Sequence, residues 1–226
     1  MPSEKNLKNR PYVILNAAMS LDGKIATISG DAEFSSEADW KRVHKLRSEM
    51  DAIMVGINTI LKDDPKLYIK NYTPNKFLRV IIDSIAHTPP NANLFNMDLS
   101  IYPVLIAVTN KAPKSKIQQL KNKGAQILET GEKNQVDLKK VMEFLVKMNI
   151  KKVLLEGGGT LNFSMIENKF IDEVRVAIAP VLVGGKSATT LVDGLGFESV
   201  CEGFHLELDY IDQIGYNVVL YYKALF

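Results

Sequence analysis

A run of three glycines carries the clearest chemical signal in the sequence. Residues 154–162 read LLEGGGTLN, so an apolar segment passes through Gly157, Gly158 and Gly159 to Thr160, where a helix can begin. Such a strand-to-helix turn exposes backbone N–H groups, which bind phosphate together with the positive end of the helix dipole. Glycine is needed where the backbone must approach an anion closely. The segment therefore predicts a phosphate-binding loop, and a tight turn without a ligand is the alternative.

The glycine run departs from the dinucleotide-binding fingerprint of the Rossmann fold. That fingerprint requires a glycine where this chain has Asn162. It also requires an acidic residue about 20 positions further on, at the end of the second strand. Here Asp172 and Glu173 stand at the start of the next predicted strand, which is the wrong end. Phosphate binding is thus predicted from the glycines without support from that fingerprint.

A second segment with polar residues at a turn is VGINTILKDDPKL, residues 55–67. Asn58 and Thr59 can cap a short helix after the strand that precedes them. Asp63 and Asp64 stand directly before a proline, which ends that helix. Paired carboxylates can serve acid–base chemistry or bind a metal ion, whereas polar turn residues ahead of a proline are the simpler interpretation.

A third segment, MSLDGKIA at residues 19–26, contains a predicted tight turn. Asp22 and Gly23 form the dipeptide that favours such a turn. Lys24 follows it, and its ammonium group could pair with an anionic substrate. Because this dipeptide is common in proteins, the segment supports a functional site only together with the other two.

Several catalytic classes lack their residues in this sequence. The three histidines, His44, His87 and His205, lie far apart and show no metal-ligand spacing. The sequence contains no P-loop, no G-x-S-x-G and no H-E-x-x-H. A zinc nucleotide deaminase needs H-x-E and P-C-x-x-C, which a chain with one cysteine does not contain. That cysteine, Cys201, is expected to be an inert packed thiol, and no metal site is expected.

Composition limits the remaining classes. The chain has 226 residues, with 28 Lys and Arg against 26 Asp and Glu, so its net charge of +2 gives a nucleic-acid partner no support. No segment approaches the roughly 20 apolar residues that span a bilayer. Residues 1–10 are polar and basic, and we expect a flexible N-terminus there rather than a signal peptide. The single cysteine favours a cytoplasmic protein, and small molecules are the expected partners.

The elements that must position these segments alternate between strands and helices. Strands are predicted at 11–19, 51–57, 77–83, 102–109, 125–129, 151–159 and 173–180, helices at 36–50, 114–123, 137–149 and 161–168, and a two-stranded ribbon at 205–211 and 216–223. Ser36 is the expected N-cap of the first helix, with Asp39 at the capping-box position. The alternation predicts an α/β fold with a mainly parallel sheet covered by helices, and the ribbon predicts an antiparallel edge. No linker or repeat interrupts the pattern, so a single domain is expected over 11–226.

Five segments, taken in their order along the chain, resemble one known family. They are NAAMSLDGKIAT (16–27), VHKLRSEMDAIMVGINTILKDDPKL (43–67), VIIDS (80–84), LLEGGGTLN (154–162) and APVLVGGK (179–186). They are similar to the dihydrofolate-reductase-like reductases of riboflavin biosynthesis. The resemblance is greatest to the stand-alone archaeal and fungal form. The same reductase occurs in bacteria fused to a zinc deaminase, and the single cysteine of this sequence is consistent with the stand-alone form. The resemblance covers residues 11–222.

The resemblance implies both a fold and a reaction. The fold would be dihydrofolate-reductase-like, with a mainly parallel central sheet flanked by helices and a C-terminal antiparallel ribbon. The reaction would be hydride transfer from NADPH, or alternatively NADH, to the ribosyl carbon of a ribosylaminopyrimidine 5′-phosphate, giving the ribitylamino product. Members of the family are commonly homodimers, so a homodimer is expected. The segment VVLYYK (218–223) could supply its interface edge or could face the core of its own chain.

The resemblance also assigns residues to the two ligands. Cofactor contacts fall on Thr59, Asp63, Asp83, Ser84, Gly157, Gly158, Gly159, Thr160, Leu161 and Asn162. Substrate contacts fall on Asn16, Lys24, Arg47, Leu67, Lys70 and Glu156. The catalytic group is not identified, and Glu156, Lys24 and Asp22 are the candidates. Arg79, with the lysines near it, is the one evident candidate for binding the 2′-phosphate of NADPH.

The sequence departs from the family pattern at three positions. Lys70 stands where bacterial members carry a phosphate-binding arginine, so the charge is kept and the bidentate fork is lost. Ala32 stands where a serine often contacts the substrate, which puts that contact in doubt. Phe34 stands where bacterial members carry a tryptophan near the nicotinamide, and an aromatic ring there can still pack on another ring.

Two other functions compete with this one. A dihydrofolate-reductase-type pterin reductase would place an acidic residue in the helix that here offers Arg47, which suits an anionic substrate better. A non-catalytic nucleotide-binding module of the same fold would be expected to have lost the LDGK, DDP or EGGG segment, and all three are present. The reductase of the phosphorylated pyrimidine is therefore the preferred interpretation.

Overall fold

The computed structural model describes residues 10–74, 76–132 and 134–226. The flexible end expected at 1–10 thus lies outside the described residues, apart from Arg10. The described chain forms two compact units, of which unit 1 holds residues 10–12 and 46–154 and unit 2 holds residues 13–45 and 155–226. No described helix is long and apolar enough to cross a membrane. The single domain expected over 11–226 stays a prediction.

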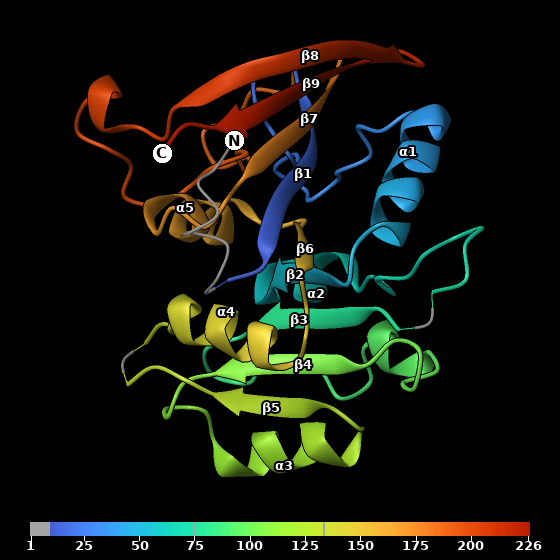
Figure 1. Ribbon diagram of the computed structural model, residues 1–226, viewed down its shortest axis with the longest axis vertical. Helices are drawn as coiled ribbons and strands as arrows, with labels where there is room; N and C mark the ends of the chain where they lie inside the picture. The colour runs from blue at the N-terminus through green and yellow to red at the C-terminus, as the bar shows by residue number, and fades with distance from the viewer. Residues whose placement is uncertain (1–9, 75, 133) are drawn as a thin grey trace. The chain divides into compact units, whose positions relative to one another are not determined.

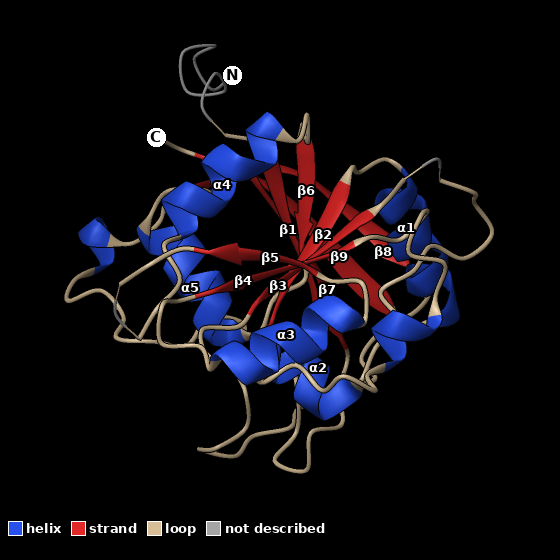
Figure 2. Cartoon of the chain, turned by 90° about the horizontal axis from the view of Figure 1, so that it is seen from below, coloured by secondary structure: helices blue, strands red, loops and turns tan. Residues whose placement is uncertain are grey.

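Unit 1 is built on a parallel sheet. Its strands are β2 (Ala52–Gly56), β3 (Leu78–Ile82), β4 (Val104–Val108), β5 (Gln126–Glu129) and β6 (Lys152–Leu155), and its helices are α2 (Ile57–Asp63), η1 (Asn93–Asn96), α3 (Lys114–Asn122) and α4 (Leu138–Lys147). The strands lie in the order β5-β4-β3-β2-β6. Figure 2 shows α4 on one face of these strands and α2 and α3 on the other. Because every strand pair from β2 to β5 is parallel, the carboxyl ends of these strands share one edge.

Burial in unit 1 follows from the sequence pattern. All five residues of β4 are buried, as expected of a strand covered on both faces. The predicted apolar face of α4 is buried through Leu138, Val141, Met142 and Leu145. The side chain of Asp137 caps this helix by accepting a hydrogen bond from the backbone N–H of Lys140.

Unit 2 combines parallel and antiparallel strands. Its elements are β1 (Tyr12–Ser20), α1 (Glu37–Ser48), α5 (Gly159–Glu167), β7 (Glu173–Ala179), η2 (Val200–Glu202), β8 (Leu206–Ile214) and β9 (Asn217–Ala224). The strands lie in the order β1-β7-β9-β8, with β1 and β7 parallel and the last three antiparallel. Figure 1 shows α1 and α5 on opposite sides of β1 and β7. The predicted α/β class and the C-terminal antiparallel ribbon are both confirmed.

In the C-terminal ribbon, the strand at the edge of the sheet is not the one suggested by the sequence. The segment VVLYYK belongs to β9, which pairs with β7 on one side and with β8 on the other. Val219 is fully buried and Tyr221 is 7% exposed, so one face of this segment packs in the core of its own unit, while Val218 on the other face is exposed. The edge of unit 2 is instead β8, where Leu208, Tyr210 and Ile211 are exposed.

Three local expectations are corrected by the structure. Cys201 is exposed in η2 rather than packed. Neither Asn58 nor Thr59 caps α2, because both lie inside its first turn and its N-cap is Gly56. At α1, Ser36 accepts a hydrogen bond from the N–H of Asp39, as an N-cap does, but the reciprocal half of the capping box is absent because the N–H of Ser36 donates to Asn217.

Candidate functional site

In unit 1, two pairs of predicted cofactor residues lie at the carboxyl edge of the parallel sheet. Thr59 and Asp63 belong to α2, which begins directly after β2. Asp83 and Ser84 follow β3 directly, and Gly56 and Ile82 are partners in the register of β2 and β3. In open α/β sheets this edge is where ligands bind. Asp63 also has a raised pKa, because its carboxyl is partly buried, although the neighbouring Lys62 opposes the shift.

The Asp83 carboxylate is engaged by its own chain. Asp83 is buried, and its two oxygens accept hydrogen bonds from the backbone N–H of His87, the backbone N–H of Thr88 and the hydroxyl of Thr88. These bonds close the turn after β3. Ser84 contributes its carbonyl to Thr109 at the end of β4. Asp83 therefore shapes the edge of the sheet through this turn.

The loop after α2 is held in place by Arg79, which the sequence had offered as a candidate for binding the 2′-phosphate of NADPH. Arg79 is fully buried and donates to the carbonyl oxygens of Lys66 and Leu94 at 3.0 and 2.7 Å, and also to that of Tyr102. Burial lowers its pKa to about 10. A guanidinium enclosed in this way cannot reach a cofactor phosphate, so the suggestion that Arg79 binds the 2′-phosphate of NADPH is wrong.

The same loop carries the predicted substrate residues of unit 1. Leu67 is 4% exposed and has a φ of 49°, in the left-handed region that branched side chains rarely adopt. Arg47, from the end of α1, donates to the carbonyl of Tyr68 at 3.0 Å, while Lys70 is exposed. Asp64 closes the other end of the loop by accepting from the backbone and side-chain N–H groups of Asn93. The loop carries Leu67 and Lys70, and Arg47 contacts it at Tyr68. It is thus fixed at several points.

In unit 2, Asp22 joins the turn after β1 to the segment after β7. Its carboxylate accepts from the Ser20 hydroxyl at 2.7 Å and from the backbone N–H groups of Val183 and Gly184 at 2.9 and 2.7 Å. These hydrogen bonds lower its pKa to about 2, with the bond from Val183 contributing most. A carboxyl group in this state is ionised near neutral pH and is not available as a general acid.

Lys24 and Asn16 are positioned by the same part of unit 2. The backbone N–H of Lys24 donates to the Ser20 hydroxyl at 2.9 Å, and its ammonium group lies 3.4 Å from the carbonyl of Ala188. Asn16, on β1, is buried and accepts at its Oδ1 from Arg42 at 3.0 Å. Both residues are therefore held by side chains or segments that lie elsewhere in the sequence.

The structure gives a local reason for each glycine of the predicted phosphate loop. Gly157 and Gly158 have positive φ values of 30° and 87°, and a Cβ on Gly157 would overlap the side-chain amide of Asn162. A Cβ on Gly159 would meet the carboxylate of Asp193 and the carbonyl of Thr190. The packing of the turn therefore accounts for all three glycines without a ligand, and the phosphate hypothesis rests on the start of α5 itself.

The first turn of α5 is tied to residues 190–194. The backbone N–H of Asp193 donates to the carbonyl of Gly159 at 3.1 Å, and Asn162 Nδ2 donates to the carbonyl of Leu191 at 2.8 Å. Asn162 Oδ1 is buried and has no hydrogen-bond partner among the described residues. Thr160 is exposed, Leu161 is buried, and Glu156 is half-buried just after β6. Sequence reasoning missed Asp193. Its only signal in the sequence is its place in a loop, directly before Gly194.

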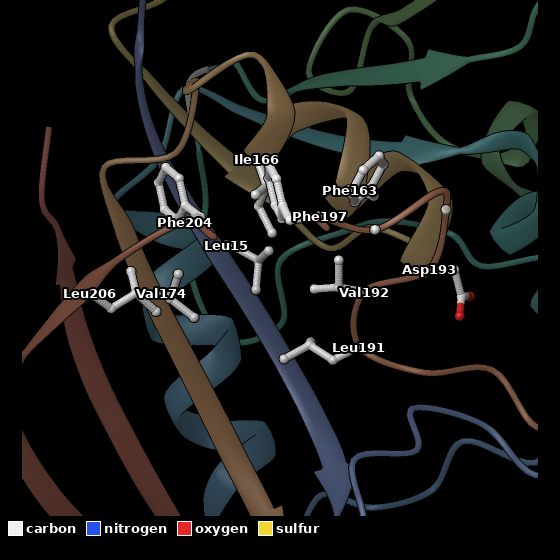
Figure 3. A pocket seen from close by; sticks show the side chains of 12 residues that line it. Leu15, Phe163, Ile166, Val174, Leu191, Val192, Asp193, Phe197, Phe204 and Leu206 are labelled. Atoms are coloured by element: carbon white, nitrogen blue, oxygen red, sulfur yellow. The ribbon is translucent and has the colours of Figure 1, made fainter. Parts of the chain in front are cut away.

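An apolar cavity of about 480 Å³ lies beside α5 in unit 2. It is lined by Leu15, Phe163, Ile166, Val174, Leu191, Val192, Asp193, Gly194, Gly196, Phe197, Phe204 and Leu206. Figure 3 shows that Asp193 lies at one end of this lining, apart from the rings of Phe197 and Phe204. None of the predicted site residues lines it. Among the described residues, no group of three His, Cys, Asp or Glu could hold a metal ion.

The parallel sheet with antiparallel C-terminal strands is the arrangement of the dihydrofolate-reductase-like reductases, which defines the class of this protein. Within that class, the sequence matches the family model of the RibD C-terminal domain over residues 11–220. The chain belongs to this family.

Two relatives of this chain from archaea share one name. The chain is 46% identical over 218 residues to the 2,5-diamino-6-ribosylamino-4(3H)-pyrimidinone 5′-phosphate reductase of Methanothermobacter thermautotrophicus, covering 95% of this chain and 99% of that protein. It is 38% identical to the protein of the same name from Archaeoglobus fulgidus, covering 91% and 94%. The resemblance inferred from the five sequence segments is confirmed.

Solved structures agree with the fold. Acinetobacter baumannii RibD superimposes with a TM-score of 0.80 at 26% identity, covering 96% of this chain and 59% of that chain. The riboflavin biosynthesis reductase Rib7 of Saccharomyces cerevisiae has a TM-score of 0.74 at 21% identity, covering 96% and 91%. At that identity the second likeness supports the fold alone.

Proposed function

We propose that this chain reduces the ribosyl group of 2,5-diamino-6-ribosylamino-4(3H)-pyrimidinone 5′-phosphate to the ribitylamino group, as a step of riboflavin biosynthesis. The observation that carries the proposal is the 46% identity to a reductase of that name, which extends over nearly the full length of both chains. Lys24 after β1 and Lys70 after α2 supply positive charges of the kind that suits an anionic substrate. Hydride would come from NADPH, with NADH as the alternative.

Each unit by itself contains residues proposed to bind the cofactor. Thr59, Asp63 and Ser84 would contact it from the carboxyl edge of unit 1, where Asp83 shapes the turn. The backbone N–H groups of residues 157–160, with Leu161 and Asn162, would hold it at the start of α5. The buried, unpartnered Asn162 Oδ1 supports this assignment, because a bound group that donates a hydrogen bond would remove the cost of burying it. When bound, the cofactor supplies the hydride.

The substrate is assigned to the remaining residues. In unit 1, Leu67 and Lys70 of the loop after α2 and Arg47 at the end of α1 would bind it, and Lys70 would offer a point charge to the phosphate. In unit 2, the proposed substrate residues are Asn16 and Lys24. Of the three catalytic candidates, Asp22 is better suited to positioning Lys24, because its oxygens are engaged by backbone N–H groups. Glu156 and Lys24 remain the candidates for holding or moving a proton near the reacting carbon.

An assay of cofactor oxidation tests the proposal. Purified protein should oxidise NADPH when the ribosylaminopyrimidine phosphate is added, in its deaminated or its non-deaminated form. Oxidation only with dihydrofolate would favour a pterin reductase, and cofactor binding without turnover on any of these would favour a non-catalytic module. Repeating the assay with NADH establishes the cofactor preference.

The role of Glu156 has a separate test. Glu156→Gln should lower turnover by about 100-fold, in the range expected for loss of a proton-transfer group, while NADPH affinity changes less than twofold. The matched control is Glu167→Gln, an exposed glutamate at the end of α5, which should change neither value. An equal loss of turnover and NADPH affinity in the Glu156 variant would remove Glu156 from the substrate side.

We also propose that the chain is a homodimer, and β8 is the candidate interface. This strand lies at the edge of unit 2 and exposes Leu208, Tyr210 and Ile211, whose backbone and side chains are suited to pairing with a second copy. Light scattering on the purified protein should give twice the mass of the chain. Ile211→Lys should shift the protein towards the monomer.

A further inference from the structure

A buried polar network connects α1 to β1 in unit 2. Arg42 Nε donates to Asp39 Oδ1 at 2.7 Å, and Arg42 Nη2 donates to Asn16 Oδ1 at 3.0 Å. Asp39 is fully buried, and its second oxygen accepts from the Ser35 hydroxyl at 2.6 Å. Arg42 therefore orients the Asn16 amide, since that amide must direct its oxygen towards the guanidinium.

The network leaves two neighbouring donor groups unused. Arg42 Nη1 is buried and has no hydrogen-bond partner among the described residues. Because the oxygen of the Asn16 amide is engaged by Arg42, its Nδ2 is the group left for another partner. A buried donor without an acceptor destabilises a fold, so such groups call for a particular explanation.

The surroundings of Arg42 determine the kind of acceptor that suits these donors. Its charge is already balanced by Asp39, so a second full negative charge is not required. Tyr221, on β9, has a pKa raised to about 12, mainly by burial, and is therefore neutral near neutral pH. Arg175 is balanced by Glu173 at 2.6 Å. A neutral oxygen acceptor fits this balanced environment better than a phosphate does.

We propose that Arg42 is a further substrate-binding residue, and that its Nη1 and Asn16 Nδ2 together bind a neutral carbonyl oxygen of the pyrimidinone ring. The assignment of this subsite to the substrate rests on the proposed function, which places Asn16 there. Arg42 has two parts in it, since it orients the Asn16 amide through Nη2 and donates to the ligand through Nη1.

The closing experiment compares Arg42→Lys with Arg175→Lys. Each substitution keeps a cation beside its carboxylate, and the two arginines have similarly low side-chain exposure, 13% and 23%. Calorimetric titration with the ribitylaminopyrimidine phosphate should show about tenfold weaker binding for Arg42→Lys, the size of a lost charged hydrogen bond, and less than a twofold change for Arg175→Lys. NADPH affinity should change less than twofold in both variants.

Two further measurements separate a ligand contact from a structural role. Ribose 5-phosphate, which has the sugar and phosphate but no ring carbonyl, should bind Arg42→Lys and the unsubstituted chain equally well. Asn16→Ala should add little to the effect of Arg42→Lys on the pyrimidine, because both act on one subsite. Melting temperatures of all variants show whether each remains folded.

Several results would overturn the proposal. These are unchanged pyrimidine affinity in Arg42→Lys, an equal loss of pyrimidine and NADPH affinity, or an equal loss for ribose 5-phosphate. Tyr221→Phe reproducing the pyrimidine effect would assign the Nη1 donor to the phenol instead. Failure of the unsubstituted chain to bind the pyrimidine would also overturn it, whereas pyrimidine binding without turnover counts against the proposed reaction alone.

Discussion

Arg79 in unit 1 and Asp22 in unit 2 perform the same task with opposite chemistry. Arg79 donates to three backbone carbonyls and fixes the loop that carries Leu67 and Lys70. Asp22 accepts from two backbone N–H groups and a hydroxyl and fixes the turn that carries Lys24. The first residue is fully buried, whereas the second is exposed.

This difference in exposure determines what each residue contributes. Removing a buried donor leaves carbonyls that water cannot reach, so the cost appears in the stability of the fold. Removing an exposed acceptor leaves N–H groups that water can satisfy, and the remaining effect depends on the charge of the carboxylate and hence on pH. In both units, a charged residue bonded to backbone groups thus fixes the position of a neighbouring segment. Its effect on the stability of the fold is large mainly in unit 1.

The largest expected effect follows from Arg79→Met. Three carbonyls lose their donor, at about 1 kcal/mol or more each, so the free energy of unfolding should fall by about 3 kcal/mol. Denaturant unfolding measures this change. Arg175→Met is the matched control, since Arg175 bonds a partly exposed glutamate, and it should cost about 1 kcal/mol or less. Equal losses in the two variants would contradict the role given to the carbonyls.

A smaller effect is expected from the exposed part of the same loop. Asn93→Ala removes the side-chain bonds to the carboxylate of Asp64 at 2.9 Å and to its carbonyl at 3.3 Å, the second of them long and weak, but keeps the bond from the backbone N–H. The free energy of unfolding should fall by about 1 kcal/mol, typical of one hydrogen bond. The KM for the pyrimidine should rise more than the KM for NADPH, because this loop carries the substrate residues. Asn110→Ala, at an exposed asparagine elsewhere in unit 1, serves as the control.

The smallest effect is expected from Asp22→Asn, and it depends on pH. The pKa of Asp22 is lowered from 3.8 to about 2, so its carboxylate stabilises the fold above the unfolded value and loses this contribution as the pH falls through 3.8 towards 2. The substitution should lower the melting temperature at neutral pH, and the difference should shrink as the pH falls over that range. Thermal melts at several pH values measure it, and a constant difference would exclude the carboxylate as its cause.

The element pattern of the fold was predictable because it depends on local signals. Buried strands such as β4 are continuous apolar runs, and α4 has its apolar residues at helical spacing, so both could be recognised from sequence alone. Which strand forms the edge of unit 2 was not predictable. VVLYYK and HLELDYI both read as ribbon strands, and only the pairing of β9 with β7 makes β8 the edge.

The candidate site was predictable where a motif is contiguous and unpredictable where partners are distant. The glycine run located the start of α5, but its packing against Asp193 and Thr190 depends on residues some thirty positions away. Arg79 was assigned to a phosphate because its sequence neighbourhood says nothing of the carbonyls that enclose it. Arg42 was overlooked for the same reason, since its contact with Asn16 joins a helix to a strand.

The exposed Cys201 has a practical consequence. It is the only cysteine in the sequence, and it lies in η2, between Phe197 and Phe204, which both line the apolar cavity. A fluorophore or spin label attached there would occupy one defined position without any engineered cysteine. Its signal would report directly on whether the segment tied to the start of α5 changes its environment when the cofactor is added.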